Sequence, residues 1–373
     1  MKLLKIISLL IITASCTTRQ ATNSIDLSAK DIDLKYAEGF TINETQNYKE
    51  ITVLNPWKKG KVHSKYYLVK DDNTAVPSDG KKIIIPLKSL VVNSATYLEF
   101  LQLLNVLDKV TGVCNAEYIY NPYILNKVKE GKIKDIGDAF NIDVENLLML
   151  RPQAVMTPAY NTEDENTKRL EQTGLSLLYN IEWQEKTPLG RAEWIKFIGA
   201  FFDKSSLADS IFNTIEKKYN DIKGQVALLS YAPSVMSGQD FRGTWSMPGG
   251  NSFNAHLFQH AGANYFYSND NSSGSISTNI ENVLINFRNA DIWVGAQANT
   301  LEELGKIDSK YKLFKAYKDG NVYNYNKRIN SNYGNDYWES AVAHPDILLA
   351  DMVKVFHPNL FPNHEFFYIK KLE

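Results

Sequence analysis

This chain lacks many of the features that would assign it to a common functional class. Only two of its 373 residues are cysteines, Cys16 and Cys114, so a framework of several disulfides is excluded. Its 41 basic and 42 acidic side chains nearly cancel, which leaves no excess of positive charge for binding nucleic acid. It contains no Gly-x-Ser-x-Gly, P-loop, dinucleotide glycine fingerprint or Cys-x-x-Cys motif. We therefore expect a binding protein rather than an enzyme, with no nucleic-acid partner.

Long apolar runs are also scarce, and the main one lies at the amino terminus. Residues 3–12 are mostly apolar but too few to span a bilayer comfortably, and Thr13-Ala14-Ser15-Cys16 follows them. Small residues that end at a cysteine are typical of a lipoprotein signal peptide. We expect Cys16 to be acylated and to anchor the protein to a membrane in the periplasm, while Cys114 is a small buried apolar residue. The alternative is a disulfide between the two cysteines.

The mature chain is long enough to bury two cores of ordinary domain size. The expected parts are a signal peptide over residues 1–15, a lipidated cysteine with a polar tether over 16–30, an amino-terminal lobe over 31–187, connecting helices over 188–223 and a carboxy-terminal lobe over 224–373.

The pattern of apolar residues predicts the fold class. Residues 36–92 are rich in β-branched and aromatic residues interrupted by turn signals, so we expect strands there. They either complete the first lobe, which we prefer, or form an extra surface for handing cargo to an outer-membrane partner. From Ser94 onward, helical patterns alternate with short apolar strands. The fold is therefore α/β: two α/β lobes with central sheets, a rigid helical connector, a ligand cleft between the lobes and a strand-rich amino-terminal extension.

Two helices are expected to connect the lobes. Thr187-Pro188 supplies N-cap and N1 signals for a helix that runs to Phe201. Ser206 opens a second helix, which we expect to end just before Gly224 and to be followed by a strand over residues 226–229. Because a helical connector is stiff, the lobes should rock by small angles.

Two segments far apart in the chain read as the same helix-to-strand unit. Glu145 lies near the start of a short amphipathic helix in residues 143–156, and Glu281 has the same place in residues 279–294. In the second segment apolar residues recur at i, i+3, i+4 and i+7, and Thr278 has capping-box spacing to Glu281. Each lobe would then carry one exposed glutamate. Alternatively, an acidic residue at this position merely complements the helix dipole.

These segments resemble a known family. In order and spacing, residues 85–355 are similar to the class III substrate-binding proteins of ABC importers, which handle iron-siderophores, haem and vitamin B12. The resemblance rests on Gly137, Glu145, Leu150-Arg151-Pro152, Ala154-Val155-Met156, residues 245–253, residues 279–284 and Asp291-Ile292-Trp293-Val294. It implies a monomer that takes up a small-molecule metal complex and docks on an ABC permease, with Glu145 and Glu281 pairing with permease arginines.

Ligands of open α/β sheets bind at the loops that follow the carboxyl ends of the strands. In this chain those loops are aromatic, which suits a large, flat, partly apolar ligand, with two arginines for carboxylate or catecholate oxygens. Packing in the core is the alternative role for each aromatic residue. The predicted ligand contacts are Tyr97, Tyr160, Trp183, Arg242, Trp245, Arg328 and Tyr333.

The sequence narrows the range of candidate ligands without identifying one. Haem-binding members of the family carry a tyrosine after the glycine that matches Gly137, and here that residue is Asp138. We therefore expect an iron-siderophore complex, with a cobamide as the alternative and an enzyme acting on a large flat ligand as the least favoured reading. His256 and His260 have i, i+4 spacing but no third ligand nearby in sequence, so no metal site and no cofactor are predicted.

Overall fold

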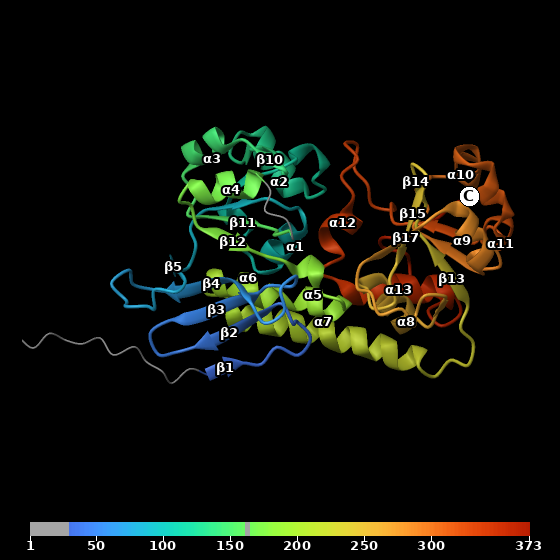
Figure 1. Ribbon diagram of the computed structural model, residues 1–373, viewed down its shortest axis with the longest axis horizontal. Helices are drawn as coiled ribbons and strands as arrows, with labels where there is room; N and C mark the ends of the chain where they lie inside the picture. Colours follow the sequence, from blue (N-terminus) through green and yellow to red (C-terminus); the bar gives the residue numbers. More distant parts are fainter. Residues whose placement is uncertain (1–29, 161–164) are drawn as a thin grey trace, which may run out of the picture.

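The computed structural model describes residues 30–160 and 165–373 (Figure 1). The described residues exclude the predicted signal peptide, Cys16 and almost all of the predicted tether. Lipidation of Cys16 therefore stays a prediction. Within the described part of the chain, no helix combines the length and the apolar character needed to cross a membrane.

The first lobe is built on a parallel sheet whose strands are largely buried except for the edge strand β8 (Lys134–Asp135), which is exposed. The crossovers between successive strands are helical, as the alternating pattern predicted. In spatial order the strands are β12 (Leu177–Tyr179), β11 (Ala154–Thr157), β6 (Leu90–Val92), β7 (Val110–Val113) and β8. The helices are α1 (Thr96–Leu103), α2 (Pro122–Lys129), α3 (Val144–Leu150) and α4 (Glu165–Gln172), with a short hairpin of β9 (Gly137–Asp138) and β10 (Asn141–Ile142) before α3.

The amino-terminal extension forms a five-stranded sheet of its own and completes the first lobe. Most of its buried side chains belong to the same core as those of the parallel sheet, and a small separate cluster consists of Tyr48, Tyr67 and Val69. Phe40 packs on Trp194 with ring centroids 4.6 Å apart, and Tyr66 packs on Phe201 at 5.6 Å. The strands are β1 (Lys30–Ile32), β2 (Phe40–Glu44), β3 (Lys49–Leu54), β4 (Val62–Val69) and β5 (Lys81–Ile84).

The second lobe repeats the sheet-and-crossover design with its own core (Figure 1). Its main sheet runs β16 (Asn264–Tyr265), β13 (Ser234–Ser237), β18 (Ile292–Val294), β19 (Val322–Asn324) and β20 (Lys370–Lys371). A small antiparallel sheet, which the sequence did not reveal, consists of β14 (Asp240–Phe241), β15 (Thr244–Pro248) and β17 (Ser275–Thr278). The helices are α8 (Phe253–His260), α9 (Ile280–Phe287), α10 (Leu301–Ile307), α11 (Lys315–Lys318), α12 (Asp336–Ser340) and α13 (Pro345–Phe356).

The connector consists of α5 (Pro188–Glu193), α6 (Ile195–Phe201) and α7 (Ser205–Val226). The Thr187 side chain caps α5 as predicted, but the helix breaks at Trp194 instead of running unbroken to Phe201. The predicted helix end before Gly224 and the predicted strand over residues 226–229 are wrong. Gly224 has open space around it and stays helical, so α7 continues to Val226 and the next strand begins at Ser234. The helix α7 packs against α6 in the first lobe and α13 in the second.

A second bridge joins the lobes away from the connector, where α12 packs on α1 (Figure 1). The Tyr120 backbone N–H donates to a Glu339 carboxylate oxygen at 2.7 Å, and the Asn330 amide nitrogen donates to the Ile119 carbonyl at 2.9 Å. The imidazole of a second-lobe histidine, His344, lies 2.8 Å from the Glu99 carboxylate of α1. The lobes are therefore held together at two separate places.

Candidate functional site

A cavity of about 970 Å³ lies between the lobes. Of the described residues, the first lobe contributes only Trp183, Gln184 and Glu185, which follow β12, and the connector contributes Arg191. Every other residue of the lining comes from the second lobe, in the segments 237–238, 246–254, 273–275, 295–299 and 324–338.

The second-lobe residues reach the cavity because parallel strands end there. Ser237 is the last residue of β13, Gly295 follows β18 and Tyr325 follows β19. Gly295 has φ of 76°, and a side chain there would approach the Tyr325 ring to 3.1 Å, so glycine suits both the turn and the close contact. The cavity therefore occupies the position that the strand-end rule predicts for a ligand.

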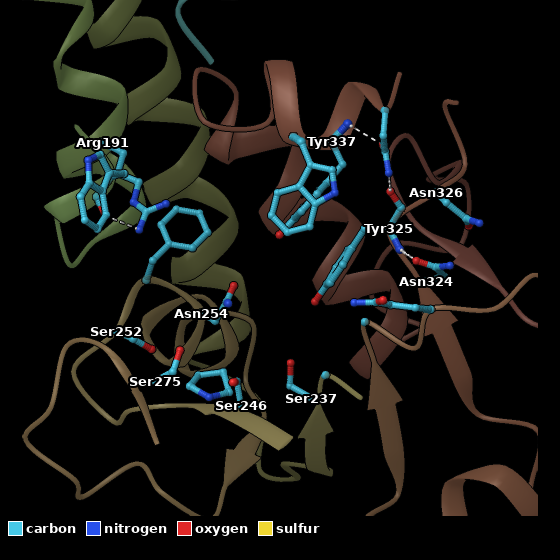
Figure 2. A pocket seen from close by; sticks show the side chains of 18 of the residues that line it. Arg191, Ser237, Ser246, Ser252, Asn254, Ser275, Asn324, Tyr325, Asn326 and Tyr337 are labelled. Carbon is cyan, nitrogen blue, oxygen red and sulfur yellow. Dashed lines mark hydrogen bonds between the residues drawn. The ribbon is translucent and has the colours of Figure 1, made fainter. Parts of the chain in front are cut away.

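Hydroxyl and amide groups dominate the polar lining of the cavity. Five serines and eight asparagine or glutamine side chains contribute, and Figure 2 shows serines below the cavity and asparagines beside it. These groups can donate or accept hydrogen bonds without carrying charge. They are Ser237, Ser246, Ser252, Ser273, Ser275, Gln184, Asn254, Gln297, Asn299, Asn324, Asn326, Asn330 and Asn335.

Aromatic rings form a further part of the cavity wall. Tyr325 and Tyr337 are stacked with their centroids 4.4 Å apart and their planes at 10°. Burial raises the pKa of Tyr337 to about 12 and raises that of Tyr325 as well, so both phenols are neutral at physiological pH. Trp338 and Trp183 add two further indole rings to the lining. Flat apolar parts of a ligand can stack on this wall while its polar atoms meet the amides.

Arg191 is the one cationic side chain among the described residues of the lining. Its Nε donates to the Glu185 carbonyl at 3.2 Å, its Nη2 donates to the Trp183 carbonyl at 2.8 Å, and its guanidinium lies 4.3 Å from the Phe253 ring centroid. Burial lowers the pKa of Arg191, and the nearby Glu182 carboxylate opposes that effect. The guanidinium is thus held in a fixed position facing Tyr325 and Tyr337 across the cavity (Figure 2).

Neither of the two glutamates nearest to Arg191 offers a carboxylate to a ligand. Glu185 lines the cavity, but its carboxylate accepts hydrogen bonds from the Glu38 and Gly39 amides and from the Trp194 indole. Glu182 is buried beneath, where burial raises its pKa to about 7 and one oxygen accepts from the Thr96 hydroxyl at 2.9 Å. The other Glu182 oxygen has no hydrogen-bond partner in the described part of the chain.

Two of the predicted ligand contacts, Trp183 and Tyr333, line the cavity. Tyr160 lies outside the lining but packs on Trp183, with the ring centroids 5.8 Å apart. Contact of these three residues with a ligand stays a prediction.

Tyr97 and Trp245 are fully buried, and their prediction as ligand contacts is wrong. The Tyr97 hydroxyl donates to the Asn180 carbonyl at 2.8 Å, and the Trp245 indole donates to the Ser237 carbonyl at 2.8 Å. Both residues lie near strand ends, but Tyr97 sits on the inner face of α1 and Trp245 on the inner face of β15. Their rings therefore fill the cores of the two lobes.

The two predicted arginines also lie outside the cavity lining. Arg242 occupies the tight turn between β14 and β15 with φ of 54°, and its guanidinium lies over Phe241. Arg328 forms an ion pair with Asp336 at 2.5 Å and lies over the Phe367 ring. The arginine that does face the cavity, Arg191, was not among the predicted ligand contacts.

The amides that line the cavity were also missed. Asn324, Asn326, Asn330 and Asn335 fall within twelve residues of sequence, and this density of asparagine was the signal that could have found them.

The two glutamates of the repeated unit are exposed, one on each lobe (Figure 1 shows their helices, α3 and α9). The N-cap of α3 is Asp143, and that of α9 is Asn279, whose side chain accepts from Asn282. The expected cap, Thr278, is instead the last residue of β17. Glu281 forms an ion pair with Lys310 at 2.8 Å, whereas no ion pair is found for Glu145 among the described residues.

The two remaining candidates from the sequence have ordinary partners. His260 bonds to the Tyr219 hydroxyl and His256 to the Asn251 amide oxygen, and burial lowers the pKa of His260 to about 4. In the described ranges no group of three or more histidine, cysteine or acidic side chains is placed to hold a metal ion. Cys114 is buried, which raises its pKa to about 12.

Comparison with known proteins adds to this geometry. The sequence model of a family described as periplasmic binding protein matches residues 90–329. An uncharacterised lipoprotein of Methanocaldococcus jannaschii is 26% identical over 380 residues, covering 92% of this chain and 87% of that protein.

Two solved structures share the fold. A Staphylococcus aureus protein in complex with heme aligns with a TM-score of 0.55 at 19% identity, over 72% of this chain and 98% of that one. A vitamin B12 binding protein of Vibrio cholerae aligns with a TM-score of 0.54 at 12% identity, over 72% and 96%.

Proposed function

Because this chain belongs to the periplasmic binding protein family, in the class III group that serves ABC importers, we propose that it captures a metal chelate and delivers it to a permease. The proposed ligand is an iron-siderophore complex, and the second candidate is a cobamide. The observation that carries the proposal is the cavity between the lobes, which has room for a ligand of this size and combines stacking rings with uncharged hydrogen-bonding groups.

The charge of the cavity favours some chelates over others. A tris-catecholate iron complex carries three negative charges, and burying them requires several cations. The described lining offers only Arg191, whereas its amides and hydroxyls can satisfy the oxygens of an uncharged complex. We therefore place neutral tris-hydroxamate iron complexes first among siderophores. The chelator supplies the metal ligands in such a complex, so none is required from the protein.

Delivery would use the two exposed glutamates. Glu145 and Glu281 lie on separate lobes of a body that is bridged twice, so they can fix one orientation on a permease that presents an arginine to each. Acylated Cys16 would hold the monomer at the membrane in the periplasm, and the lipoprotein relative is in line with this anchoring.

The ligand can be tested by titrating the purified protein with four probes: a ferric tris-hydroxamate, a ferric tris-catecholate, cyanocobalamin and haemin. Trp183 and Trp338 line the cavity, so tryptophan fluorescence reports occupancy, and native mass spectrometry gives the stoichiometry and reveals any chemical change. We expect one unmodified hydroxamate complex per chain and weaker binding of the catecholate. If the protein binds none of the four probes, the proposed function is contradicted. Turnover of a bound probe would favour an enzyme.

A further inference from the structure

The segment between β1 and β2 is held by the connector in an unusual way. The backbone amides of residues 35–39, which we term the strap, all donate to just two carboxylates, those of Glu193 and Glu185. Lys35, Tyr36 and Ala37 bond to Glu193 at 3.1, 2.8 and 2.9 Å. Glu38 and Gly39 bond to Glu185 at 3.0 and 2.8 Å.

Both carboxylates are buried, with 0% of Glu193 and 7% of Glu185 exposed. Glu193 also has a cation, since Lys196 lies 2.8 Å away. No ion pair of Glu185 is found among the described residues, so backbone amides of the strap and the Trp194 indole are what stabilise its charge. The strap therefore contributes more to stabilising the buried charge of Glu185 than to stabilising that of Glu193.

The contact between Glu185 and the strap is closely fitted. A side chain at Gly39 would approach the Trp194 ring to 2.8 Å and the Glu185 carboxylate to 3.0 Å. Only glycine leaves room at this position for the Gly39 amide to reach the Glu185 carboxylate. The strap is further tied to α7, where the Tyr36 hydroxyl lies 2.9 Å from the Glu216 carboxylate.

Glu185 also contacts Arg191, the one cation among the described residues of the cavity lining, through its main chain. Its carbonyl accepts from Arg191 Nε, and the carbonyl of Trp183, two residues earlier, accepts from Nη2. The side chain of Glu185 thus faces the strap while its backbone faces the cavity. Glu193, although it holds the same strap, is not among the hydrogen-bond partners of Arg191 in the described chain.

We infer that Glu185 is a positioning residue through which the strap, residues 35–39, holds the Arg191 guanidinium in place for the ligand. The strap lies outside residues 90–329, the part that matches the family, so this arrangement gives the amino-terminal extension a role in binding. The inference rests on the proposed function only in that Arg191 meets a ligand.

The test compares Glu185→Gln with Glu193→Gln, because each variant weakens the hold on the strap but only the first disturbs the residue bonded to Arg191. Binding of the ferric tris-hydroxamate and of cyanocobalamin is measured by tryptophan fluorescence, and folding by thermal melting. We expect both variants to melt earlier. We expect Glu185→Gln to weaken probe binding roughly tenfold and Glu193→Gln by less than about twofold. Equal losses in the two variants would show a merely structural role and overturn the inference.

A double-mutant cycle with Arg191→Gln locates the effect. If Glu185 acts through Arg191, adding Glu185→Gln to Arg191→Gln causes no further loss of affinity. A full additional loss would overturn the inference. If Glu185→Gln fails to fold, Gly39→Ala disturbs the same contact from the side of the strap and should give the same loss and the same dependence on Arg191.

A measurement without ligand separates this inference from the proposed function. Phenylglyoxal modifies accessible arginines, and peptide mass spectrometry gives its rate at Arg191. Glu185→Gln should speed modification of Arg191 several-fold, and Glu193→Gln should leave it unchanged. If the native protein binds neither probe, the proposed function fails while this measurement still decides the inference; an unchanged rate in Glu185→Gln overturns it.

Discussion

The two lobes share one design, a mainly parallel sheet with helical crossovers, yet they contribute very unequally to the cavity between them. Within the described part of the chain, the first lobe supplies three consecutive residues after a single strand, whereas the second lobe supplies five segments. The difference lies in the strand-end loops: those of the second lobe carry asparagines and serines, while Tyr97 of the first lobe is turned into the core. The fold fixes where a ligand binds, and loop composition decides which lobe recognises it.

The outer surfaces of the lobes, in contrast, should contribute equally to docking. Replacing both Glu145 and Glu281 with alanine is expected to abolish uptake while ligand affinity stays within a factor of a few, because neither residue lines the cavity. Transport of a labelled chelate measures this, with Glu302→Ala as the control, since Glu302 is also an exposed helical glutamate on the second lobe. Normal transport by the double variant would refute the docking role.

The unequal shares of the cavity lead to a second prediction. Tyr325→Ala in the second lobe removes a stacked ring and should weaken binding of the preferred chelate about thirtyfold, whereas Trp183→Ala in the first lobe should weaken it about fivefold. Fluorescence or calorimetric titration gives both values. Tyr231→Ala, an exposed tyrosine outside the lining, should change nothing. A larger loss in Trp183→Ala would reverse the assigned roles of the lobes.

Each lobe also buries one carboxyl group whose pKa is raised to about 7, Glu182 in the first and Glu339 in the second. Each carboxyl group binds its proton more tightly in the native state than in the unfolded state, where its pKa is 4.5. Both groups therefore make the free energy of unfolding fall as pH rises from about 4.5 to about 7. Glu182→Gln should therefore raise the free energy of unfolding at pH 8 by on the order of 1–3 kcal/mol and flatten its pH dependence.

Denaturant unfolding at pH 5 and pH 8 measures this effect. Glu339→Gln should raise the free energy of unfolding by less, because the Glu339 carboxylate also accepts a hydrogen bond from the Tyr120 amide, and this bond joins the two lobes. A Glu182→Gln variant that is less stable than the native protein at pH 8 would show that the charged carboxylate is needed.

The smallest predicted effect concerns one difference between α3 and α9, the ion pair of Glu281 with Lys310. Both partners are exposed, so the pair is weak and screened by salt. Lys310→Ala frees Glu281 and should raise the association rate with the permease by about twofold at low salt, with no change at high salt. Lys306→Ala, which removes a nearby lysine from a different pair, provides the control. Slower association of Lys310→Ala would mean that Lys310 itself contacts the permease.

The sequence predicted those parts of the molecule that depend on local pattern. The alternation of helix and buried strand gave both lobes and the strand-rich extension, and the spacing around Glu145 and Glu281 gave two exposed acids on separate lobes. Gly224 misled because a glycine surrounded by solvent can remain within a helix when α7 packs on both lobes.

The cavity was harder to predict because it depends on which way side chains point. Tyr97 and Trp245 lie at the right places in the chain but on the inner faces of their elements, which only tertiary packing decides. Arg191 was missed because its partners are the backbone carbonyls of Trp183 and Glu185. Every residue has such a carbonyl, so the sequence does not show which ones bind an arginine. Asparagine is also a common loop residue, so its role in a binding site is hidden among its roles in turns.

The bridge formed by Tyr120, Ile119, Glu339 and Asn330 limits how the molecule can open. A body fastened at two separate points has one easy axis of motion, the line through those points, and resists displacement in other directions. Twisting about this axis changes the width of the mouth without detaching either fastening. If the protein delivers cargo as proposed, we therefore expect release to involve rotation of the lobes about this axis and not a straight separation of the two halves.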